Sequence, residues 1–229
     1  MVKDIKDVCF IIQARLSSQR VPKKMIRPFA DTTLVDLAIE KVLNSKIIPK
    51  ENIYFSVYEP ELKDIGHKHG IKVFERSEKS AMCENNILDL YEWHDKLDYK
   101  YVVLISACLP FLTVKTIDSF VEAYLNTDSG GLFAVMGKKQ YYWNSNKEMI
   151  SHWPAAQKLM NTKTMSTTYE AAHCLYASRM DIIKDGYWMD NNLPPRPELF
   201  IVQEEEVLDI DYEWQFVACE AYYKEKMKK

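Results

Sequence analysis

VCFII (residues 8–12) is a continuous apolar run, and the polar stretch QARLSSQRVPKK (residues 13–24) follows it directly. Five apolar residues without alternation are typical of a strand that is buried on both faces of a sheet. A helical pattern comes next, with apolar residues at Leu34, Leu37, Ala38 and Val42. Thr32 or Thr33 is placed to cap this helix. The opening of the chain therefore predicts a strand, a long polar loop and a helix, which form the first half of a βαβ unit.

The same alternation continues along the chain. We predict further strands at residues 53–57, 71–74, 101–106, 131–136, 173–177 and 200–202. We predict further helices at residues 59–69, 86–96 and 114–125, and a last helix near the end of the chain. Alternating strands and helices indicate the α/β class with a mostly parallel central sheet flanked by helices. No stretch rich in Pro, Gly or Ser suggests a linker, so residues 1–229 are expected to form one domain.

The last predicted helix carries an apolar stripe. Its members are Trp214, Val217, Ala218, Ala221 and Tyr222. Their spacing places all five on one face of a helix. We therefore expect this stripe to pack on the core of the domain.

Residues 137–171 break the alternation. They form a polar stretch that is rich in aromatic residues, namely Tyr141, Tyr142, Trp143 and Trp153. These side chains require burial, and exposed patches of this kind are typical of interfaces. We predict that residues 137–171 form an inserted arm that packs on a second subunit, so that the protein is a homodimer.

Charge and cysteine content exclude several classes of protein. The formal net charge of -3 argues against a general affinity for nucleic-acid phosphates. Residues 1–7 carry charges of both signs and lead into a short apolar run, which predicts neither a signal sequence nor a membrane span. The five cysteines include no CxxC pair, which fits neither a disulfide framework nor a zinc site. We expect a cytoplasmic protein without a nucleic-acid or membrane partner.

The polar loop after the first strand is strongly basic. Its cations are Arg15, Arg20, Lys23, Lys24 and Arg27. Ligands of open parallel sheets bind outside the carboxyl ends of the strands, and a triphosphate requires positive charge and many hydrogen-bond donors. The loop has neither the GxxxxGK[ST] nor the GxGxxG pattern. Pattern alone leaves two interpretations open, a phosphate-binding loop and a solvated basic loop.

A pair of aspartates lies near the other end of the chain. Asp209 and Asp211 are two residues apart, so on an extended segment both carboxylates point to the same side. Together they are suited to bind one divalent cation such as Mg²⁺, which phosphoryl-type transfer requires. The alternative is that one or both cap the helix that follows.

Both segments resemble motifs of the acylneuraminate cytidylyltransferase family, which includes CMP-sialic acid synthetases. Residues 12–24 resemble the opening motif of the family, and DID at 209–211 resembles the segment before its last helix. The basic and proline positions of the opening motif are kept at Arg15, Arg20, Pro22 and Lys24. Lys23 stands where the family has Gly, and Leu16 and Ser17 stand where Gly is frequent. The resemblance covers most of the chain and is weakest in the arm.

This resemblance implies a single Rossmann-like nucleotidyltransferase domain. The implied reaction is the Mg²⁺-dependent transfer of CMP from CTP to a small acidic acceptor with release of pyrophosphate, in surface polysaccharide or capsule biosynthesis. The resemblance implies catalytic roles for Arg15 and Lys24 and metal binding by Asp209 and Asp211. The implied nucleotide-binding residues are Ala14, Arg15, Ser17, Ser18, Arg20, Lys24, Arg76 and Ser106.

Two segments in the middle of the chain bear on the substrates. Residues 106–113 resemble the place where sialic acid synthetases carry QPTSPL, and Pro110 is retained. Ser106 replaces a Gln that helps to read the sugar acid in the family. The acceptor is therefore expected to be either a nonulosonic acid, which gives a CMP-sugar, or a phosphorylated small molecule, which gives a CDP-adduct. Residues 74–77 are similar to a family segment whose Arg approaches the nucleotide, although Arg76 is also placed for a surface salt bridge.

An acidic acceptor requires cations and an aromatic wall. The candidates are Cys108, Lys138, Lys139, Tyr169 and Glu170. Cys108 is included because it lies beside the predicted site, and solvated lysines are the alternative for Lys138 and Lys139. None of the five histidines lies in a Ser/His/Asp or HExxH arrangement, so we assign catalysis to none of them.

Two other classes remain open from the sequence. A glycosyltransferase with a related nucleotide-binding sheet also uses paired aspartates and Mg²⁺, but it usually carries them after a middle strand. A non-catalytic nucleotide-binding protein is consistent with the missing glycines of the loop.

Overall fold

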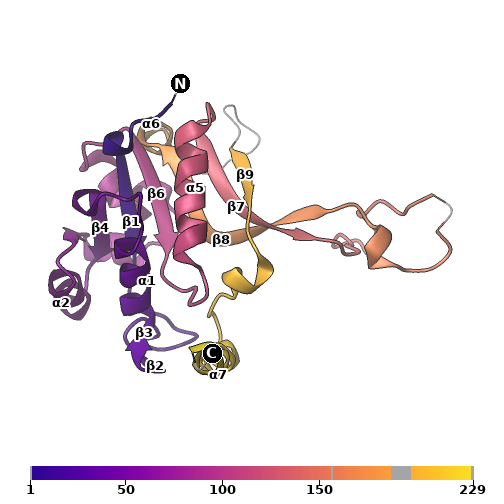
Figure 1. Ribbon diagram of the computed structural model, residues 1–229, viewed down its shortest axis with the longest axis horizontal. Helices are drawn as coiled ribbons and strands as arrows, with labels where there is room; N and C mark the ends of the chain where they lie inside the picture. The colour runs from indigo at the N-terminus through magenta and orange to yellow at the C-terminus, as the bar shows by residue number, and fades with distance from the viewer. Residues whose placement is uncertain (1, 156, 187–196, 228–229) are drawn as a thin grey trace.

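The computed structural model describes residues 2–155, 157–186 and 197–227. Within these residues a seven-stranded sheet has the order β5-β4-β1-β6-β8-β7-β9 (Figure 1). The strands are β1 (Val8–Gln13), β4 (Ile53–Val57), β5 (Lys72–Glu75), β6 (Tyr101–Ser106), β7 (Gly131–Lys138), β8 (Thr168–Arg179) and β9 (Glu198–Ile201). β8 runs antiparallel to β6 and β7, and the other pairs are parallel. The predicted mostly parallel sheet is confirmed.

The first strand lies in the interior of the sheet, between β4 and β6, and is its most buried element. Residues 8–12 have no exposed surface, as expected for a strand covered on both faces. Val8, Phe10 and Ile12 belong to one hydrophobic cluster, and Cys9 and Ile11 belong to another. This alternation shows that helices cover both faces of the sheet, as in a Rossmann-like domain.

Helices pack on each of these two clusters. The helices are α1 (Leu34–Leu43), α2 (Pro60–Lys68), α3 (Glu78–Met82), α4 (Ile87–Leu90), α5 (Val114–Asn126), α6 (Met180–Lys184) and α7 (Glu213–Met227). Buried residues of α1, α2, α5 and α7 join the larger cluster, whereas α6 and the 3₁₀ helix η3 (Glu92–Asp95) contribute to the smaller one. Thr33 caps α1 as predicted, because its Oγ1 accepts a hydrogen bond from the Asp36 amide at 3.2 Å.

Three local predictions need correction. The helix predicted at residues 86–96 is divided into α4 and η3, because Tyr91 leaves helical geometry with φ −105° and ψ 49°. The helices α3 and α6 were not predicted, since five residues are too few for a periodic signal. The pair β2 (Pro28–Phe29) and β3 (Thr32–Thr33) forms a separate two-stranded sheet before α1.

The prediction that the apolar stripe of the last helix packs on the core is wrong. Trp214, Val217 and Tyr222 of α7 are 67%, 55% and 42% exposed, and Ala218 and Ala221 are exposed as well. The buried face is formed instead by Phe216 and Cys219. Helix α7 is therefore apolar on two faces, and the structure of one chain buries only one of them.

The predicted arm is an extension of β7 and β8 that projects from the body of the molecule (Figure 1). The arm connects Lys138 at the end of β7 to Thr168 at the start of β8. Of residues 137–171, only Ala156 lies outside the described residues. In the part of the chain that the structure describes, no helix is both long and apolar enough to cross a membrane.

Candidate active site

A cavity of about 710 Å³ opens at the carboxyl ends of β1 and β6. Its wall includes the loop after β1 at Ala14, Arg15, Ser17, Ser18, Gln19, Arg20 and Lys24. Ser106 and Cys108 line it from the end of β6, His173 and Tyr176 from β8, and Asp211 from the segment before α7. A cavity of this size at this edge of the sheet is the usual ligand site of an open α/β fold.

Two side chains that follow the neighbouring strands β4 and β5 hold the start of the basic loop. The Leu16 amide donates to Oε1 of Glu59 at 2.6 Å, and Nη2 of Arg76 donates to the Ala14 carbonyl at 2.7 Å. Arg76 is only 4% exposed, so the alternative of a surface salt bridge is wrong. Burial lowers the pKa of Arg76 to about 10, opposed by the negative charge of Glu59. Arg76 lines the cavity and also orders the backbone of the loop.

The tight turn of the loop is made at Lys23, the position at which the resembled motif has Gly. Lys23 has φ 54°, in the left-handed region that a Cβ atom disfavours. The Lys24 amide donates to the Val21 carbonyl at 3.2 Å, and the amides of Ile26 and Arg27 donate to the Lys23 carbonyl at 3.0 Å. The tight turn of the loop is therefore made without the glycine.

Replacing Lys23 by Gly is expected to raise the free energy of unfolding by about 0.5 kcal/mol. The steric cost of the left-handed conformation, ~1 kcal/mol, exceeds the extra entropy that Gly gives the unfolded chain. Denaturant titration measures the change, and Lys23→Ala is the matched control because it removes the charge and keeps the Cβ atom. Equal stabilisation by both variants would show that charge, and not backbone geometry, is responsible.

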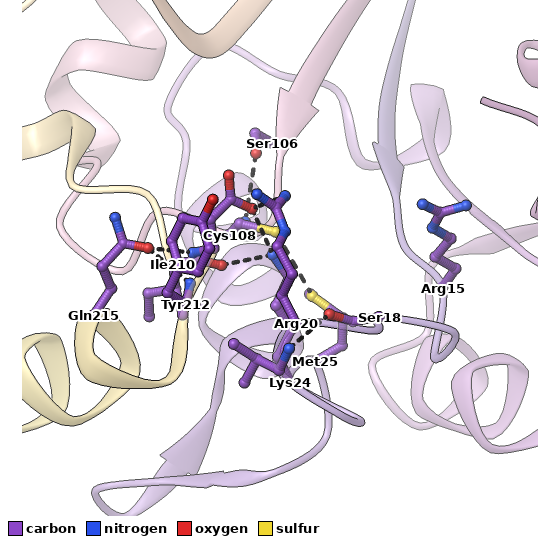
Figure 2. A network of polar contacts seen from close by, with 12 residues as sticks. Arg15, Ser18, Arg20, Lys24, Met25, Ser106, Cys108, Ile210, Tyr212 and Gln215 are labelled. Atoms are coloured by element: carbon purple, nitrogen blue, oxygen red, sulfur yellow. Dashed lines mark hydrogen bonds and ion pairs between the residues drawn. The ribbon is translucent and has the colours of Figure 1, made fainter. Parts of the chain in front are cut away.

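Side chains of the loop meet the segment before α7 in one polar network (Figure 2). Nη2 of Arg20 lies 2.8 Å from Oδ1 of Asp211, and Nζ of Lys24 lies 3.6 Å from the same oxygen. Lys24 also donates to the Ile210 carbonyl at 2.6 Å. Almost the whole length of the chain separates these residues in sequence, so the fold brings the two motif segments to the same wall of the cavity.

The two aspartates do not cap α7. The amides of Asp211 and Tyr212 donate instead to Oε1 of Gln215, each at 2.8 Å (Figure 2). Gln215 therefore satisfies two backbone amides that precede α7, as the Glu or Gln of a capping box does. The carboxylate of Asp211 is paired with Arg20, and Oδ1 of Asp209 is buried without a hydrogen-bond partner.

The Asp209 carboxyl has a raised pKa. Burial raises the pKa of its carboxyl, and the charge of Asp211 raises it further, whereas Lys24 opposes both effects. A buried carboxylate oxygen without a donor is suited to bind a hard cation. Among the described residues no group of three or more His, Cys, Asp and Glu side chains forms a complete metal cage. Two carboxylates and no cage fit Mg²⁺, which usually takes its other ligands from water and phosphate oxygens.

Arg15 lies apart from this network (Figure 2). Its Nη2 is 2.8 Å from Oε1 of Glu84, and its Nη1 donates to the Ala81 carbonyl at 3.3 Å. Both charged side chains are substantially exposed, and such ion pairs contribute about 0–1 kcal/mol. Arg15 is therefore held weakly at the mouth of the cavity by a competing carboxylate.

The hydroxyl and thiol candidates also line the cavity. Oγ of Ser17 is buried without a partner, and Oγ of Ser18 accepts a hydrogen bond from the Val21 amide at 3.4 Å. Oγ of Ser106 accepts from the Cys108 amide at 3.4 Å. Burial raises the pKa of the Cys108 thiol, which keeps the sulfur neutral and unsuited to act as a nucleophile.

Four acceptor candidates lie outside this cavity. Lys138 forms an ion pair with Glu204, and Lys139 is exposed next to it at the base of the arm. Tyr169 and Glu170 are exposed on the opposing strand, where they pair with Gly137 and Met136. Of the acceptor candidates, the structure places only Cys108 in the wall of the cavity.

His173 is a candidate residue that the sequence analysis set aside. It lines the cavity, has φ 51° and lies beside an irregularity in the pairing of β7 with β8. Its Nδ1 is hydrogen-bonded to the Tyr176 hydroxyl at 2.9 Å. Strained backbone of this kind in a non-glycine residue concentrates at functional sites. No pattern in the sequence marks the bulge, so only the strand pairing reveals this residue.

A Rossmann-like sheet, a basic loop after β1 and the facing carboxylate of Asp211 are the arrangement of a nucleotidyltransferase. A family model described as cytidylyltransferase matches residues 9–203. The chain belongs to this family.

Individual relatives agree with this assignment. The chain is 24% identical to a pseudaminic acid cytidylyltransferase of Campylobacter jejuni over 222 residues, which cover 90% of this chain and 91% of that protein. It is 26% identical to the spore coat polysaccharide biosynthesis protein SpsF of Bacillus subtilis over 132 residues. That match covers 55% of this chain and 52% of the relative, so the chain spans about half the length of SpsF.

Solved structures share the fold. A CMP:2-keto-3-deoxy-manno-octonic acid synthetase complexed with CTP has a TM-score of 0.72 at 12% identity, with 96% of this chain and 99% of that chain covered. A 4-diphosphocytidyl-2C-methyl-D-erythritol synthase from Anaerococcus prevotii has a TM-score of 0.68 at 12% identity, with 96% and 98% covered. At such low identity these two structures show a common architecture.

Proposed function

We propose that this cytidylyltransferase transfers CMP from CTP to a small acidic acceptor and releases pyrophosphate, in the biosynthesis of a surface polysaccharide. The observation that carries the proposal is the meeting of the basic loop and Asp211 in one cavity, where Arg20 and Lys24 face the Asp211 carboxylate at 2.8 and 3.6 Å. Cations for phosphate and carboxylates for a metal ion are the two requirements of nucleotidyl transfer.

The residues of this chain supply binding and orientation more than acid–base chemistry. In the transfer, an oxygen of the acceptor forms a bond to the α-phosphorus of CTP, and the bond from that phosphorus to the pyrophosphate oxygen breaks. A hydroxyl acceptor also releases its proton. Arg15, Arg20 and Lys24 would hold the phosphates, since positioning and charge stabilisation account for most catalysis of this type.

Asp209 and Asp211 would hold Mg²⁺. A bound Mg²⁺ supplies neutralisation of the charge on the phosphate oxygens and on the leaving pyrophosphate. Asp211 already faces Arg20 and Lys24, so the same carboxylate joins the metal side of the site to the phosphate side. Asp209 contributes the buried oxygen that has no protein donor.

The order of the strands separates a nucleotide side from an acceptor side. The basic loop follows β1, and β6 lies between β1 and β8 in the sheet. β8 presents His173 and Tyr176 to the same cavity, in the region where it pairs with the carboxyl half of β6. With the triphosphate at β1, the acceptor would lie near His173, Tyr176 and Ser106.

The acceptor class is supported by two lines of argument. The names of two relatives specify pseudaminic acid and spore coat polysaccharide, which favours a sugar acid. Ser106 in place of the Gln of the resembled motif favours a different reading of that acid, and a phosphorylated small molecule is the second candidate.

A pyrophosphate-release assay tests the proposal. The purified protein is incubated with CTP, Mg²⁺ and a panel of nonulosonic acids and phosphorylated small molecules, and UTP, ATP and GTP are compared with CTP. We expect pyrophosphate with CTP and one acceptor class only. Absence of pyrophosphate for every combination, together with a thermal shift by CTP, would favour a non-catalytic nucleotide-binding protein.

Replacing His173 by Ala is expected to raise the KM for the acceptor about tenfold and to leave the KM for CTP within about twofold. Loss of one hydrogen bond to an anionic acceptor corresponds to about 1.5 kcal/mol, which is a factor of about ten. Steady-state kinetics with each substrate varied in turn measures both values. His67→Ala is the control, because His67 is exposed on α2 and does not line the cavity. An unchanged KM for the acceptor would show that His173 does not bind the acceptor.

A further inference from the structure

Gln13 ends the apolar run of β1 and is one of three polar residues at the carboxyl ends of adjacent strands. Its register partners are Ser56 on β4 and Ser106 on β6. Residues two apart on a strand share a face, so Gln13 lies on the side of Ile11, where Trp93 of η3 packs. Gln13 also lines the cavity of the candidate site. A polar side chain is thus placed between the core and the cavity.

The amide of Gln13 is fixed in one orientation. Nε1 of Trp93 donates to its Oε1 at 3.1 Å, and Oγ of Ser56 donates to the same oxygen at 3.4 Å. An indole N–H is a donor only, so it faces the oxygen of the amide and not the NH₂ group. Trp93 and Ser56 have no exposed surface, so turning the amide over would leave the Trp93 N–H buried without an acceptor.

The NH₂ group is the part of the Gln13 amide that remains for a ligand. Within the residues that the structure describes, Nε2 of Gln13 forms no hydrogen bond, and it does not belong to the buried polar atoms that lack a partner. This nitrogen is therefore accessible from the cavity that Gln13 lines. The cavity presents a fixed hydrogen-bond donor at this point, and the acceptor end of the same amide is turned away from it.

The surroundings of Gln13 fit the base of a nucleotide. Leu90 and Tyr91 line the cavity, and the Tyr91 ring lies 5.1 Å from the ring of Trp93. The proposed function places the triphosphate at the loop after β1 and the acceptor toward β8. The base would then lie on the remaining side, between that loop and the junction of α4 with η3. An aromatic and an aliphatic side chain supply apolar contact for a planar ring there.

We propose that Gln13 selects cytosine over uracil and that Trp93 positions its amide for this purpose. The inference rests on the proposed function, since it takes CTP as the nucleotide. N3 of cytosine is a hydrogen-bond acceptor, whereas N3 of uracil carries a proton and is a donor. The NH₂ group of Gln13 donates to N3 of cytosine and meets a second donor in uracil. Two facing donors disfavour the wrong base, because both lose their hydrogen bonds to water.

Titration of the full chain with CTP and with UTP in the presence of Mg²⁺ tests the proposal. We expect the wild type to bind CTP at least about tenfold more tightly than UTP. Gln13→Glu keeps the size of the side chain and an oxygen for Trp93, but it replaces the donor in the cavity by an acceptor. The preference for CTP over UTP is expected to fall at least about tenfold in this variant. The added negative charge repels both triphosphates equally, so it does not change their ratio.

Gln19→Glu is the matched control for the added charge. Gln19 is exposed, lies on the same loop and lines the same cavity. We expect this variant to weaken CTP and UTP binding alike and to keep the ratio of the two dissociation constants within about twofold. A fall in the ratio as large as that of Gln13→Glu would overturn the proposal, because charge alone would then explain both variants.

Trp93→Phe tests the positioning role. Loss of the indole N–H frees the Gln13 amide to turn its oxygen toward the cavity. UTP binding is therefore expected to become about fivefold tighter, and CTP binding to change by less than about threefold. Thermal unfolding verifies that the variant folds. A role of Trp93 in packing alone would weaken both nucleotides alike, and that result would overturn the positioning role.

Two further results would overturn the selection of the base. One is equal binding of CTP and UTP by the wild type, and the other is a loss in Gln13→Glu that both nucleotides share equally. Failure of the proposed function has a different signature, because nucleotide binding needs no acceptor. A chain that shows the expected ratios and releases no pyrophosphate would contradict the transfer reaction and would still support selection of cytosine by Gln13.

Discussion

Replacing Asp209 by Asn is expected to lower Mg²⁺-dependent turnover by at least about 10²-fold and to raise the unfolding midpoint of the metal-free protein by a few degrees. A metal ligand is lost, which removes charge stabilisation worth several kcal/mol. At the same time a buried carboxylate, one oxygen of which has no hydrogen-bond donor, becomes a neutral amide, which removes a desolvation penalty of ~1 kcal/mol. Turnover and thermal unfolding of the same preparation measure both effects.

The pH dependence of this stabilisation has a definite sign. The folded-state pKa of Asp209 is raised, so its contribution to stability is full below the unfolded-state value of about 4 and is lost as the pH rises through the folded value. The advantage of the Asn variant is therefore expected at neutral pH and should vanish near pH ~4. Mg²⁺ should shift the unfolding midpoint of the wild type upward and leave the variant unchanged.

The capping alternative makes the opposite prediction for the same variant. Loss of a helix cap would destabilise the protein by about 1 kcal/mol and would leave the Mg²⁺ response intact. Asp211→Asn is the matched comparison, because Asp211 is already paired with Arg20. We expect that change to lower turnover without stabilising the metal-free protein.

The sheet could be predicted from the sequence where burial is complete. Residues 8–12, 53–57 and 101–106 are apolar enough to be recognised as strands, and β4 and β6 begin and end where predicted. The antiparallel direction of β8 was not predictable in this way, because strand direction depends on how distant segments pair.

The last helix shows the limit of periodicity. The pattern correctly places Trp214, Val217 and Tyr222 on one side of α7, but it does not determine whether the core of the domain covers that side. In the folded chain, Phe216 and Cys219 pack on the core instead. Helical spacing fixes which residues share a face, whereas the contacts of the folded chain decide which face is buried.

Some features of the candidate site could be predicted from the sequence, and others could not. The order of the two motif segments predicted that the basic loop and the aspartates serve one ligand, and the fold brings Lys24 to Ile210 and Asp211. His173 became visible only through its backbone conformation, since φ at a bulge is set by strand pairing. Lys138 was named for its charge alone, and the structure pairs that charge with Glu204.

Replacing Arg15 by Ala is expected to lower kcat/KM for CTP by about 10²–10³-fold, the usual cost of removing one preorganised donor to a developing charge. Its guanidinium stands at the mouth of the cavity on a weak, exposed pair with Glu84. A triphosphate offers more charge and more acceptors than one carboxylate, so Arg15 should exchange Glu84 for phosphate. Steady-state kinetics measures the loss, and Arg179→Ala is the control because Arg179 forms a similar exposed pair with Asp181 outside the cavity.

Replacing Glu84 by Gln is expected to strengthen CTP binding, whereas replacing Arg15 weakens the use of CTP. Removal of the competing carboxylate is expected to tighten CTP binding by up to about fivefold, since an exposed ion pair contributes at most about 1 kcal/mol. Titration with CTP measures the dissociation constant, and Glu75→Gln is the matched control because Glu75 pairs with Lys63 away from the cavity. Weaker CTP binding by the Glu84 variant would contradict this argument, because it would mean that Glu84 holds Arg15 in the geometry that binds the nucleotide.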